Sequence, residues 1–432
     1  MGRSSAEQRF EEYVERLGNA LGHADRREPL RAYLTGLLLS GERKSVEPMA
    51  ARVDPRHVRA RHQSMHHFVA KATWSERAVL AVAREVALAQ LERHGPVAAW
   101  IVDDTSFPKK GRHSVGVIRQ YCGALGRQDT CQVAVMVSLA NSMMSIPSAW
   151  QLYLPQAWCG DEVRREAAGV PREVEFAPKW QIALAQIDML LAEQLPPAPV
   201  VADAGYGVTF EFRQALTARG LPYAVGVTKE TSIWRPGEGP LPPAEWKGAG
   251  RPPTLLRRSE EQRPCSVLEL ARELPDKAYR TVTWREGTRG AMQSRFARCR
   301  VRPAHRDNWR RAPHEKEWLV IEWPKGEKEP TRYWLSTTSK TASAAELVAL
   351  LKMRWRIERD FQEMKDELGL DHFEGRGWRG FHHHGALCIA AYAFLAAERA
   401  RLSPPEPLAF LRPVRLPTGF RPRGSATAGR TS

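Results

Sequence analysis

The sequence predicts a mixed α/β protein, in which helices cover both faces of a mixed sheet, with an all-helical N-terminal region and a β-rich insertion. The first 95 residues carry helical periodicity and no strand-like alternation. Residues 96–227 open with three apolar runs and continue as alternating helix and strand patterns. Residues 228–335 are rich in proline, tryptophan and charge, and helical periodicity returns over 336–400.

The N-terminal region, residues 1–95, contains a candidate helix-turn-helix. A short helix over 45–52 is followed by Asp54-Pro55, which predicts the start of a basic helix reaching about residue 70. Arg59 and Arg61 lie on the polar side of this helix, where they could donate to phosphates or base edges. The alternative is a helical bundle with a solvated basic face.

The pattern of residues 96–227 predicts the first part of a core built on a mixed sheet. Its three apolar runs come before any helix and favour an antiparallel meander. Alternating helices and strands then favour a mixed sheet with helices on its faces. The predicted strands are 97–102, 131–140, 146–154, 200–202 and 223–227, and the predicted helices are about 178–195 and 208–219.

Residues 228–335 are predicted to be a β-rich insertion, because the helical pattern resumes after them and the core sheet would otherwise lack its last helix. Residues 336–400 are then the last part of the core, with one long helix from Ala342 to about Leu368. The tail, residues 401–432, is basic and rich in proline and arginine, a composition typical of disorder.

The composition favours a polyanionic partner and no membrane. The chain has 65 Lys+Arg against 49 Asp+Glu in 432 residues, a formal charge of +16, and lysine and arginine that neutralise phosphates release counterions. The most apolar run, residues 385–397, is shorter than the ~20 residues that a membrane span needs, and the N-terminus lacks a signal-like apolar stretch. We therefore expect a cytoplasmic protein. The six scattered cysteines favour neither disulfides nor a zinc site.

Carboxylates at two predicted strand ends are the first candidates for chemistry. Asp103 and Asp104 follow the first apolar strand, and Asp203 follows the strand 200–202. Acidic groups at the ends of adjacent strands point into the crevice where α/β sheets bind ligands, and Mg²⁺ is the natural cation between them. For a single strand-end aspartate, a helix cap or turn is the more common role.

A third carboxylate lies on the predicted long helix. Glu358 comes four residues after Arg354 and seven before Lys365, so the three side chains share one face of the helix. An ion-pair ladder is the alternative. A surface ladder, however, has no need of the neighbouring Trp355 and Ile357.

With these residues in place, the chain resembles the DDE transposases of bacterial insertion sequences, in the branch whose ribonuclease-H-like core is interrupted by a β-rich insertion. The resemblance spans about residues 42–400. It depends most on IVDDTSFPKKGRHSVGVIRQYCG (101–123), VVADAGYG (200–207) and RWRIERDFQEMKDELGLDHFEGRGWRGFHHH (354–384). The third motif of this branch runs Tyr-x2-Arg-x3-Glu-x6-Lys. Arg354, Glu358 and Lys365 fit this spacing, but Leu351 stands at the tyrosine position.

The resemblance implies that Asp104, Asp203 and Glu358 are the catalytic and metal-binding triad. Asp104 is preferred to Asp103 because the family motif places its aspartate directly before threonine. The family activity is Mg²⁺-dependent strand cleavage and transfer. The implied cofactor is a pair of Mg²⁺ ions, for which Mn²⁺ can substitute, and two such ions need no covalent protein nucleophile.

Basic and aromatic side chains around the motifs are candidate DNA contacts. Arg354 and Lys365 would hold phosphates near the triad, and further cations would extend this track. Some family members form a DNA hairpin with a flipped base held on an aromatic ring, for which Tyr333 and Trp334 are candidates. Packing within the insertion, or a solvated loop for the lysines, is the alternative. The further cations are Arg356, Arg376, Arg379, Lys109 and Lys110.

The histidine run, His382 to His384, is a weak candidate for a metal site. Three adjacent imidazoles cannot share one face of a helix, and partners at ligand spacing are absent from the sequence around them. Packing and hydrogen bonding are the expected roles.

The resemblance therefore implies a transposase that binds the terminal inverted repeats of its element and a target duplex as a homodimer, associated with the bacterial nucleoid. Two alternatives remain. One is a metal-dependent nuclease without joining activity, and the other is a catalytically silent DNA-binding protein derived from a transposase.

Overall fold

The computed structural model describes residues 5–287 and 290–403. Within them the chain forms two compact units. Unit 1 contains the described residues up to Leu190 and from Met353 onward, and unit 2 contains Leu191–Lys352. Nearly all of the predicted tail, residues 404–432, lies outside the described residues. In the described part of the chain, no helix is both long and apolar enough to cross a membrane.

The N-terminal region of unit 1 is helical, as predicted, and Tyr13, Leu17 and Leu34 are among its buried residues. The basic helix begins later than expected. Asp54 ends the preceding helix, its carboxylate accepts a hydrogen bond from the His57 backbone N–H, and the basic helix starts at Val58. The helices are α1 (Ala6–Ala20), α2 (Arg27–Leu38), α3 (Val46–Val53), α4 (Val58–Ala70) and α5 (Glu76–Arg93).

Four antiparallel strands form the sheet of unit 1, which confirms the predicted meander. The long strand β3 pairs with β1, β2 and β4. Strand β2 was not predicted from the sequence, because its side chains alternate between partly buried and exposed positions and form no apolar run. The strands are β1 (Ala99–Pro108), β2 (Ile118–Cys122), β3 (Arg127–Ala140) and β4 (Ser145–Leu152).

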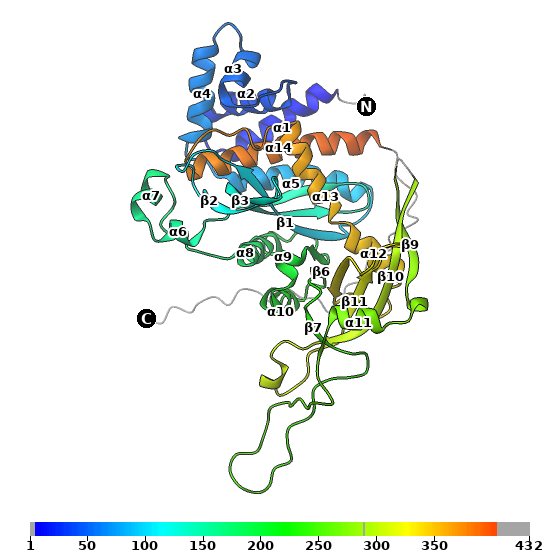
Figure 1. The fold of residues 1–432 in the computed structure, drawn as a ribbon. Helices are drawn as coiled ribbons and strands as arrows, with labels where there is room; N and C mark the ends of the chain where they lie inside the picture. The colour runs from blue at the N-terminus through cyan, green and yellow to red at the C-terminus, as the bar shows by residue number, and fades with distance from the viewer. Residues whose placement is uncertain (1–4, 288–289, 404–432) are drawn as a thin grey trace, which may run out of the picture. The chain divides into compact units, whose positions relative to one another are not determined.

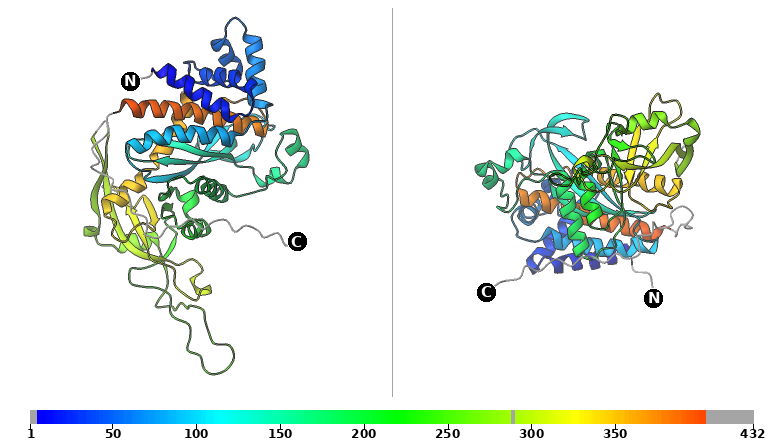
Figure 2. Two further views of the ribbon diagram at one scale, coloured as in Figure 1. Left: turned by 180° about the vertical axis from the view of Figure 1, so that it is seen from behind. Right: turned by 90° about the horizontal axis from the view of Figure 1, so that it is seen from below.

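Helices from distant parts of the sequence pack against this sheet. The long C-terminal helix α14 (Trp378–Leu402) and α5 lie side by side and both contact β4 (Figure 2). Helix α13 (Trp355–Asp366) contacts β1 and β4 (Figure 1). The other helices of this unit are α6 (Gln156–Cys159), α7 (Glu162–Ala167) and α8 (Lys179–Ala192), the last of which extends two residues past the boundary.

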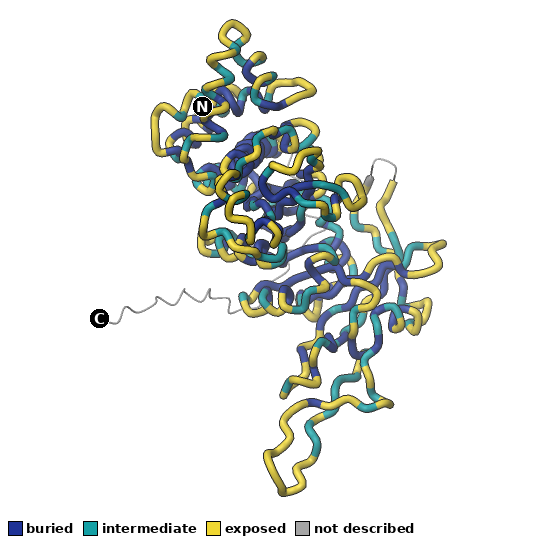
Figure 3. Tube along the Cα trace, turned by 60° about the vertical axis from the view of Figure 1, so that its left-hand side comes forward, coloured by how far each residue is buried: buried dark blue, intermediate teal, exposed yellow. Residues whose placement is uncertain are grey.

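Unit 2 contains a mixed sheet. Strand β5 (Val200–Ala202) is parallel to β6 (Tyr223–Val227), and the remaining pairs are antiparallel. A long, mostly exposed loop, residues 235–264, connects β7 (Ser232–Trp234) to β8 (Cys265–Ser266) (Figure 3). The remaining elements are α9 (Ala204–Gly207), α10 (Phe210–Ala218), β7 (Ser232–Trp234), β8 (Cys265–Ser266), α11 (Val267–Glu273), β9 (Arg280–Gly287), β10 (Gly290–Pro303), β11 (Glu317–Glu322), β12 (Arg332–Ser336) and α12 (Ala344–Lys352).

The predicted fold class is confirmed: the chain is mixed α/β, and an antiparallel meander followed by a parallel pair with intervening helices is the ribonuclease-H-like order of elements. One helix prediction is wrong. The expected continuous helix over 342–368 is two helices, α12 and α13, with a break at Met353 and Arg354. No glycine or proline marks this break in the sequence. The predicted domain boundaries remain a prediction.

Candidate active site

Asp103 and Asp104 lie within β1 and not at its end, so the strand-end expectation was wrong. Strand β1 continues through Pro108, because residues 105–108 keep their pairing with β3. Asp103 lies opposite Met136 and Asp104 lies opposite Val135. Successive side chains of a strand point to opposite faces, so the two carboxylates project from opposite faces of the sheet.

The face of Asp103 meets helix α13. Nη1 of Arg354 donates to Oδ2 of Asp103 at 2.5 Å, and Nη2 of the same guanidinium donates to Glu358. The Asp103 side chain is 11% exposed, while that of Glu358 is 53% exposed. Arg354 thus joins a buried carboxylate of the strand to an accessible carboxylate of the helix.

Lys365 lies further along α13, on the same face of the sheet. Its Nζ donates to the backbone oxygen of Ser106 at 3.0 Å and lies 5.1 Å from the ring centroid of Phe107. Burial lowers the pKa of this ammonium. Arg354 and Lys365 both bond to residues of β1, and Glu358 bonds to Arg354, which agrees with the prediction that the three side chains share one face of the helix.

The face of Asp104 meets a different helix. Nζ of Lys179, the first residue of α8, lies 3.0 Å from Oδ2 of Asp104. Asp104 was preferred from the sequence because of the threonine that follows it. The structure instead brings Asp103 together with Glu358, and the signal that could have identified Asp103 is the two-residue alternation of a strand that continues past both aspartates.

Asp203 lies in unit 2, directly after β5, where the sequence placed it. It occupies the N-cap position of α9, yet its side chain makes no capping hydrogen bond. Its Oδ1 is buried and lacks a hydrogen-bond partner among the described residues. The common role of a strand-end aspartate as a helix cap therefore does not account for this residue, and a buried unpaired oxygen is costly unless something else binds it.

Two glycines shape the turn that holds Asp203. A Cβ on Gly207 would lie 1.9 Å from the backbone oxygen of Gly226, and a Cβ on Gly226 would lie 2.8 Å from the Ala204 nitrogen. The backbone of α9 is therefore in close contact with the backbone of β6, and neither Gly207 nor Gly226 has space for a side chain. This close approach fixes the backbone from which the Asp203 carboxylate projects.

The carboxylates fit a hard divalent cation by their chemistry. Carboxylate oxygens are the ligands that Mg²⁺ prefers. The buried Oδ1 of Asp203, which has no hydrogen-bond partner among the described residues, is an oxygen that a cation could bind. Within residues 5–287 and 290–403, no three His, Cys, Asp or Glu side chains are gathered closely enough to hold an ion. Arg354 supplies the positive charge between Asp103 and Glu358.

Most of the other predicted contacts around the motifs hold backbone oxygens. Nζ of Lys109 donates to the backbone oxygen of Phe373 at 3.0 Å, and burial lowers the pKa of the Lys109 ammonium. Arg379 donates to Lys71 at 2.9 Å, and Arg356 donates to Ser142. Lys110 and Arg376 are exposed. In the N-terminal region Arg59 is exposed, whereas Arg61 is paired with Glu28 and with Asp54 at 3.5 Å.

The predicted base-stacking aromatics pack inside unit 2. Tyr333 and Trp334 belong to β12 and are only 6% and 8% exposed. The Tyr333 hydroxyl donates to the Pro330 oxygen at 3.2 Å, and Trp334 packs beside Phe296. Neither ring is open to a base in this structure, which agrees with the alternative of packing.

The histidine run is buried and bonded to backbone, as expected. Nδ1 of His382 bonds to the oxygen of Trp378, and its Nε2 accepts from the Leu152 N–H. His383 lies between the oxygens of Val69 and Trp74. Burial lowers the pKa of His383 and of His384 to about 4, so both imidazoles are neutral at pH 7.

A carboxylate on a central strand, one after β5 and one on a helix beyond a β insertion are typical of ribonuclease-H-like nucleases. Residues 16–291 match the family described as DDE superfamily endonuclease. Because the match covers more than half of the 432 residues, the chain belongs to the DDE superfamily endonucleases. Members of this family are endonucleases that act on DNA and generally use divalent metal ions.

One curated relative carries a more specific description. The chain is 30% identical over 166 residues to a protein named probable transposase for insertion sequence element IS701, from Microchaete diplosiphon. This alignment covers 38% of the chain, and the chain spans 40% of the length of that relative. The family recognised from the motifs is confirmed. Glu358 lies outside the family match, so its role depends on its motif and its geometry.

Proposed function

We propose that the protein is a DDE transposase that binds the terminal inverted repeats of an insertion sequence and catalyses Mg²⁺-dependent DNA cleavage and strand transfer. The observation that carries the proposal is the contact of Arg354 with both Asp103 and Glu358, because it brings a strand carboxylate and the Glu of the third motif to one cation. The family and the IS701-element relative support this function.

The proposed metal ligands are Asp203, Glu358 and one aspartate of β1. Asp104 follows from the motif, but the shared Arg354 supports Asp103 as that ligand. These carboxylates would hold a pair of divalent ions, which when bound would activate the attacking hydroxyl and stabilise the leaving oxygen. The ions are proposed to be Mg²⁺, with Mn²⁺ as a substitute.

Arg354, at the N-cap of α13, and Lys365, within the helix, have a separate task in this mechanism. Arg354 is a planar fork that can hold a phosphate through two N–H donors, and Lys365 is a point charge on the same face. Together they would orient the strand so that its scissile phosphate meets the carboxylates. Two copies of the chain are proposed to bring the two ends of the element together.

The test is cleavage of a labelled duplex that ends in the terminal repeat, followed by transfer of the cut end into a target duplex. Asp203→Asn should abolish cleavage in Mg²⁺ and leave binding of the repeat nearly unchanged, because contacts to phosphates supply most of the affinity. Retained cleavage by this variant contradicts the proposal. Cleavage without transfer identifies a nuclease, and binding without cleavage by the wild type identifies a silent binder.

A further inference from the structure

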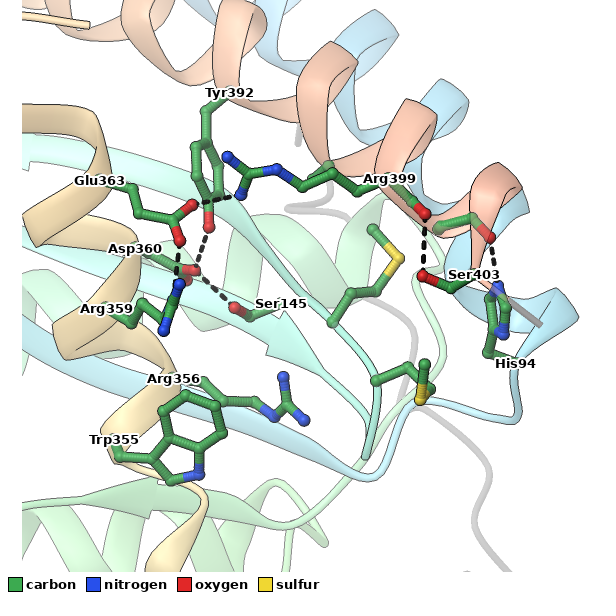
Figure 4. Close-up of a pocket in the computed structure, with 14 residues that line it drawn as sticks. His94, Ser145, Trp355, Arg356, Arg359, Asp360, Glu363, Tyr392, Arg399 and Ser403 are labelled. Carbon is green, nitrogen blue, oxygen red and sulfur yellow. Dashed lines mark hydrogen bonds and ion pairs between the residues drawn. The ribbon is translucent and has the colours of Figure 1, made fainter. Parts of the chain in front are cut away.

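A second basic site lies on α13, around the helix from Glu358. Helix α13, helix α14 and the turn that leads into β4 enclose a cavity of about 210 Å³ within unit 1 (Figure 4). Successive residues of a helix are rotated by about 100° around its axis. Arg356, Arg359 and Glu363 therefore lie on a side of α13 that points away from Glu358 and toward this cavity. The polar residues that line it are His94, Ser145, Arg356, Arg359, Asp360, Glu363, Tyr392, Arg399 and Ser403, and Trp355 is also in the wall.

Two guanidinium groups in this cavity share one carboxylate. Nε of Arg359 donates to Oε1 of Glu363 at 2.7 Å, and Nη1 of Arg399 donates to Oε2 at 2.5 Å (Figure 4). The two arginines lower the pKa of Glu363, which is therefore ionised. A guanidinium carries five N–H donors, so one carboxylate cannot saturate two of them. Glu363 fixes the positions of both arginines and leaves the pair with a net positive charge.

The lining of the cavity includes a buried carboxylate, Asp360, that accepts hydrogen bonds from three hydroxyls. The hydroxyls of Ser145 and Tyr392 donate to Oδ1 of the buried Asp360 at 2.5 and 2.9 Å, and that of Ser138 donates to Oδ2 at 3.3 Å. These hydrogen bonds hold the Asp360 carboxylate in place and offset part of the cost of its burial. Nδ1 of His94, another lining residue, is buried and has no hydrogen-bond partner among the described residues.

We propose that this cavity, which we call the α13–α14 pocket, binds a phosphate of the DNA strand that leads away from the cleavage site. This inference depends on the proposed function. The pocket is smaller than the roughly 300–1,000 Å³ of sites for whole small molecules, so it suits one anionic group of a larger ligand. Paired arginines hold phosphate oxygens through bidentate hydrogen bonds. The chain's charge of +16 agrees with a polyanionic partner.

The test measures binding of a labelled duplex by fluorescence anisotropy in EDTA, over a series of salt concentrations. Arg359→Gln and Arg399→Gln should each weaken binding by about tenfold, the range of a hydrogen bond to a charged group. Each should also reduce the slope of log affinity against log salt by about one. Arg401→Gln is the matched control, since Arg401 lies on the same helix and pairs with Glu398 at 3.4 Å outside the pocket.

The variant Glu363→Gln distinguishes specific binding of a phosphate by two positioned arginines from general electrostatic attraction of DNA. This change adds one positive charge, so attraction alone predicts tighter binding of DNA. If Glu363 orders the two arginines for a phosphate, binding should weaken instead. Tighter binding by Glu363→Gln, or equal losses for Arg399→Gln and Arg401→Gln, would overturn the proposal. Thermal unfolding of each variant checks that the fold is intact.

A final arm distinguishes DNA from a free anion. Inorganic phosphate is titrated against the wild type and Arg399→Gln, with the unfolding midpoint as readout. Suppose that phosphate stabilises the wild type and that the pocket variants bind DNA as tightly as the Arg401→Gln control. The pocket then binds free anions, and the proposed DNA contact is overturned. A wild type that binds no DNA refutes the proposed function itself, whereas normal binding and cleavage by both pocket variants refutes this inference alone.

Discussion

The two faces of β1 carry adjacent aspartates that have different surroundings. On one face, Arg354 joins Asp103 to Glu358 of α13. On the other face, Lys179 of α8 pairs with Asp104. The residues are neighbours in the sequence and equivalent in chemistry, yet the alternation of the strand gives them different partners. The register of a strand therefore decides which of two neighbouring carboxylates shares a cation with the glutamate of a distant helix.

Substitution of each aspartate in turn should distinguish the roles of Asp103 and Asp104. Asp103→Asn should lower the rate of DNA cleavage in Mg²⁺ by roughly a thousandfold or more, because losing one metal-binding carboxylate costs several kcal/mol of transition-state stabilisation. Asp104→Asn should lower the rate by less than about tenfold, the effect of about 1.4 kcal/mol. Single-turnover cleavage of a labelled duplex measures both rates. The opposite order of effects restores Asp104 as the catalytic residue.

The elements that support these aspartates were predicted from the sequence with unequal success. The strand 200–202 and the strand 223–227 have their predicted bounds, because short apolar runs between breakers have clear ends. The end of β1 was placed too early, because Thr105 to Pro108 are not an apolar run and their strand pairing depends on β3. Sequence periodicity reports which residues avoid water, but it does not report which partner strand completes a ladder.

The helix that carries Glu358 illustrates the same limit. Its spacing of Arg354, Glu358 and Lys365 was correct, since local geometry fixes which residues of a helix share a face. The break before Trp355 was missed because it has no glycine or proline signal. Asp360 was missed as well. Its role depends on Ser138, Ser145 and Tyr392, which are far away in the sequence and come together only in the folded chain.

Asp360 attaches α13 to the face of the sheet on which Asp103 lies. Its partner Ser138 lies opposite Ile101, which shares a face with Asp103. Burial raises the pKa of Asp360 from 3.8 to about 6. A raised carboxyl pKa stabilises the fold fully below pH 4, and this contribution is lost as the pH rises through 6. The loss amounts to roughly 3 kcal/mol, about two pKa units.

Asp360→Asn should remove this pH dependence, because an amide keeps an acceptor for the hydroxyls and does not ionise. Thermal unfolding should show the wild type losing stability relative to Asp360→Asn between about pH 4 and 6. Glu358→Gln is the control, since it changes an exposed carboxylate on the same helix. Parallel stability curves for the wild type and Asp360→Asn would contradict a buried, titrating Asp360.

The smallest effect concerns the cation that Asp103 shares with Glu358. If a divalent ion binds these carboxylates, it must compete with the Arg354 guanidinium, since both cations need the same oxygens. Arg354→Gln should therefore bind Mn²⁺ about tenfold more tightly, a change of about 1.4 kcal/mol that is well within the coulombic energy of charges at contact distance. Electron paramagnetic resonance of free Mn²⁺ measures this affinity without DNA or catalysis. Lys179→Gln, on the face of Asp104, is the matched control and should leave the affinity unchanged. If Lys179→Gln tightens Mn²⁺ binding and Arg354→Gln does not, the ion belongs to the Asp104 face and the roles of the two faces are reversed.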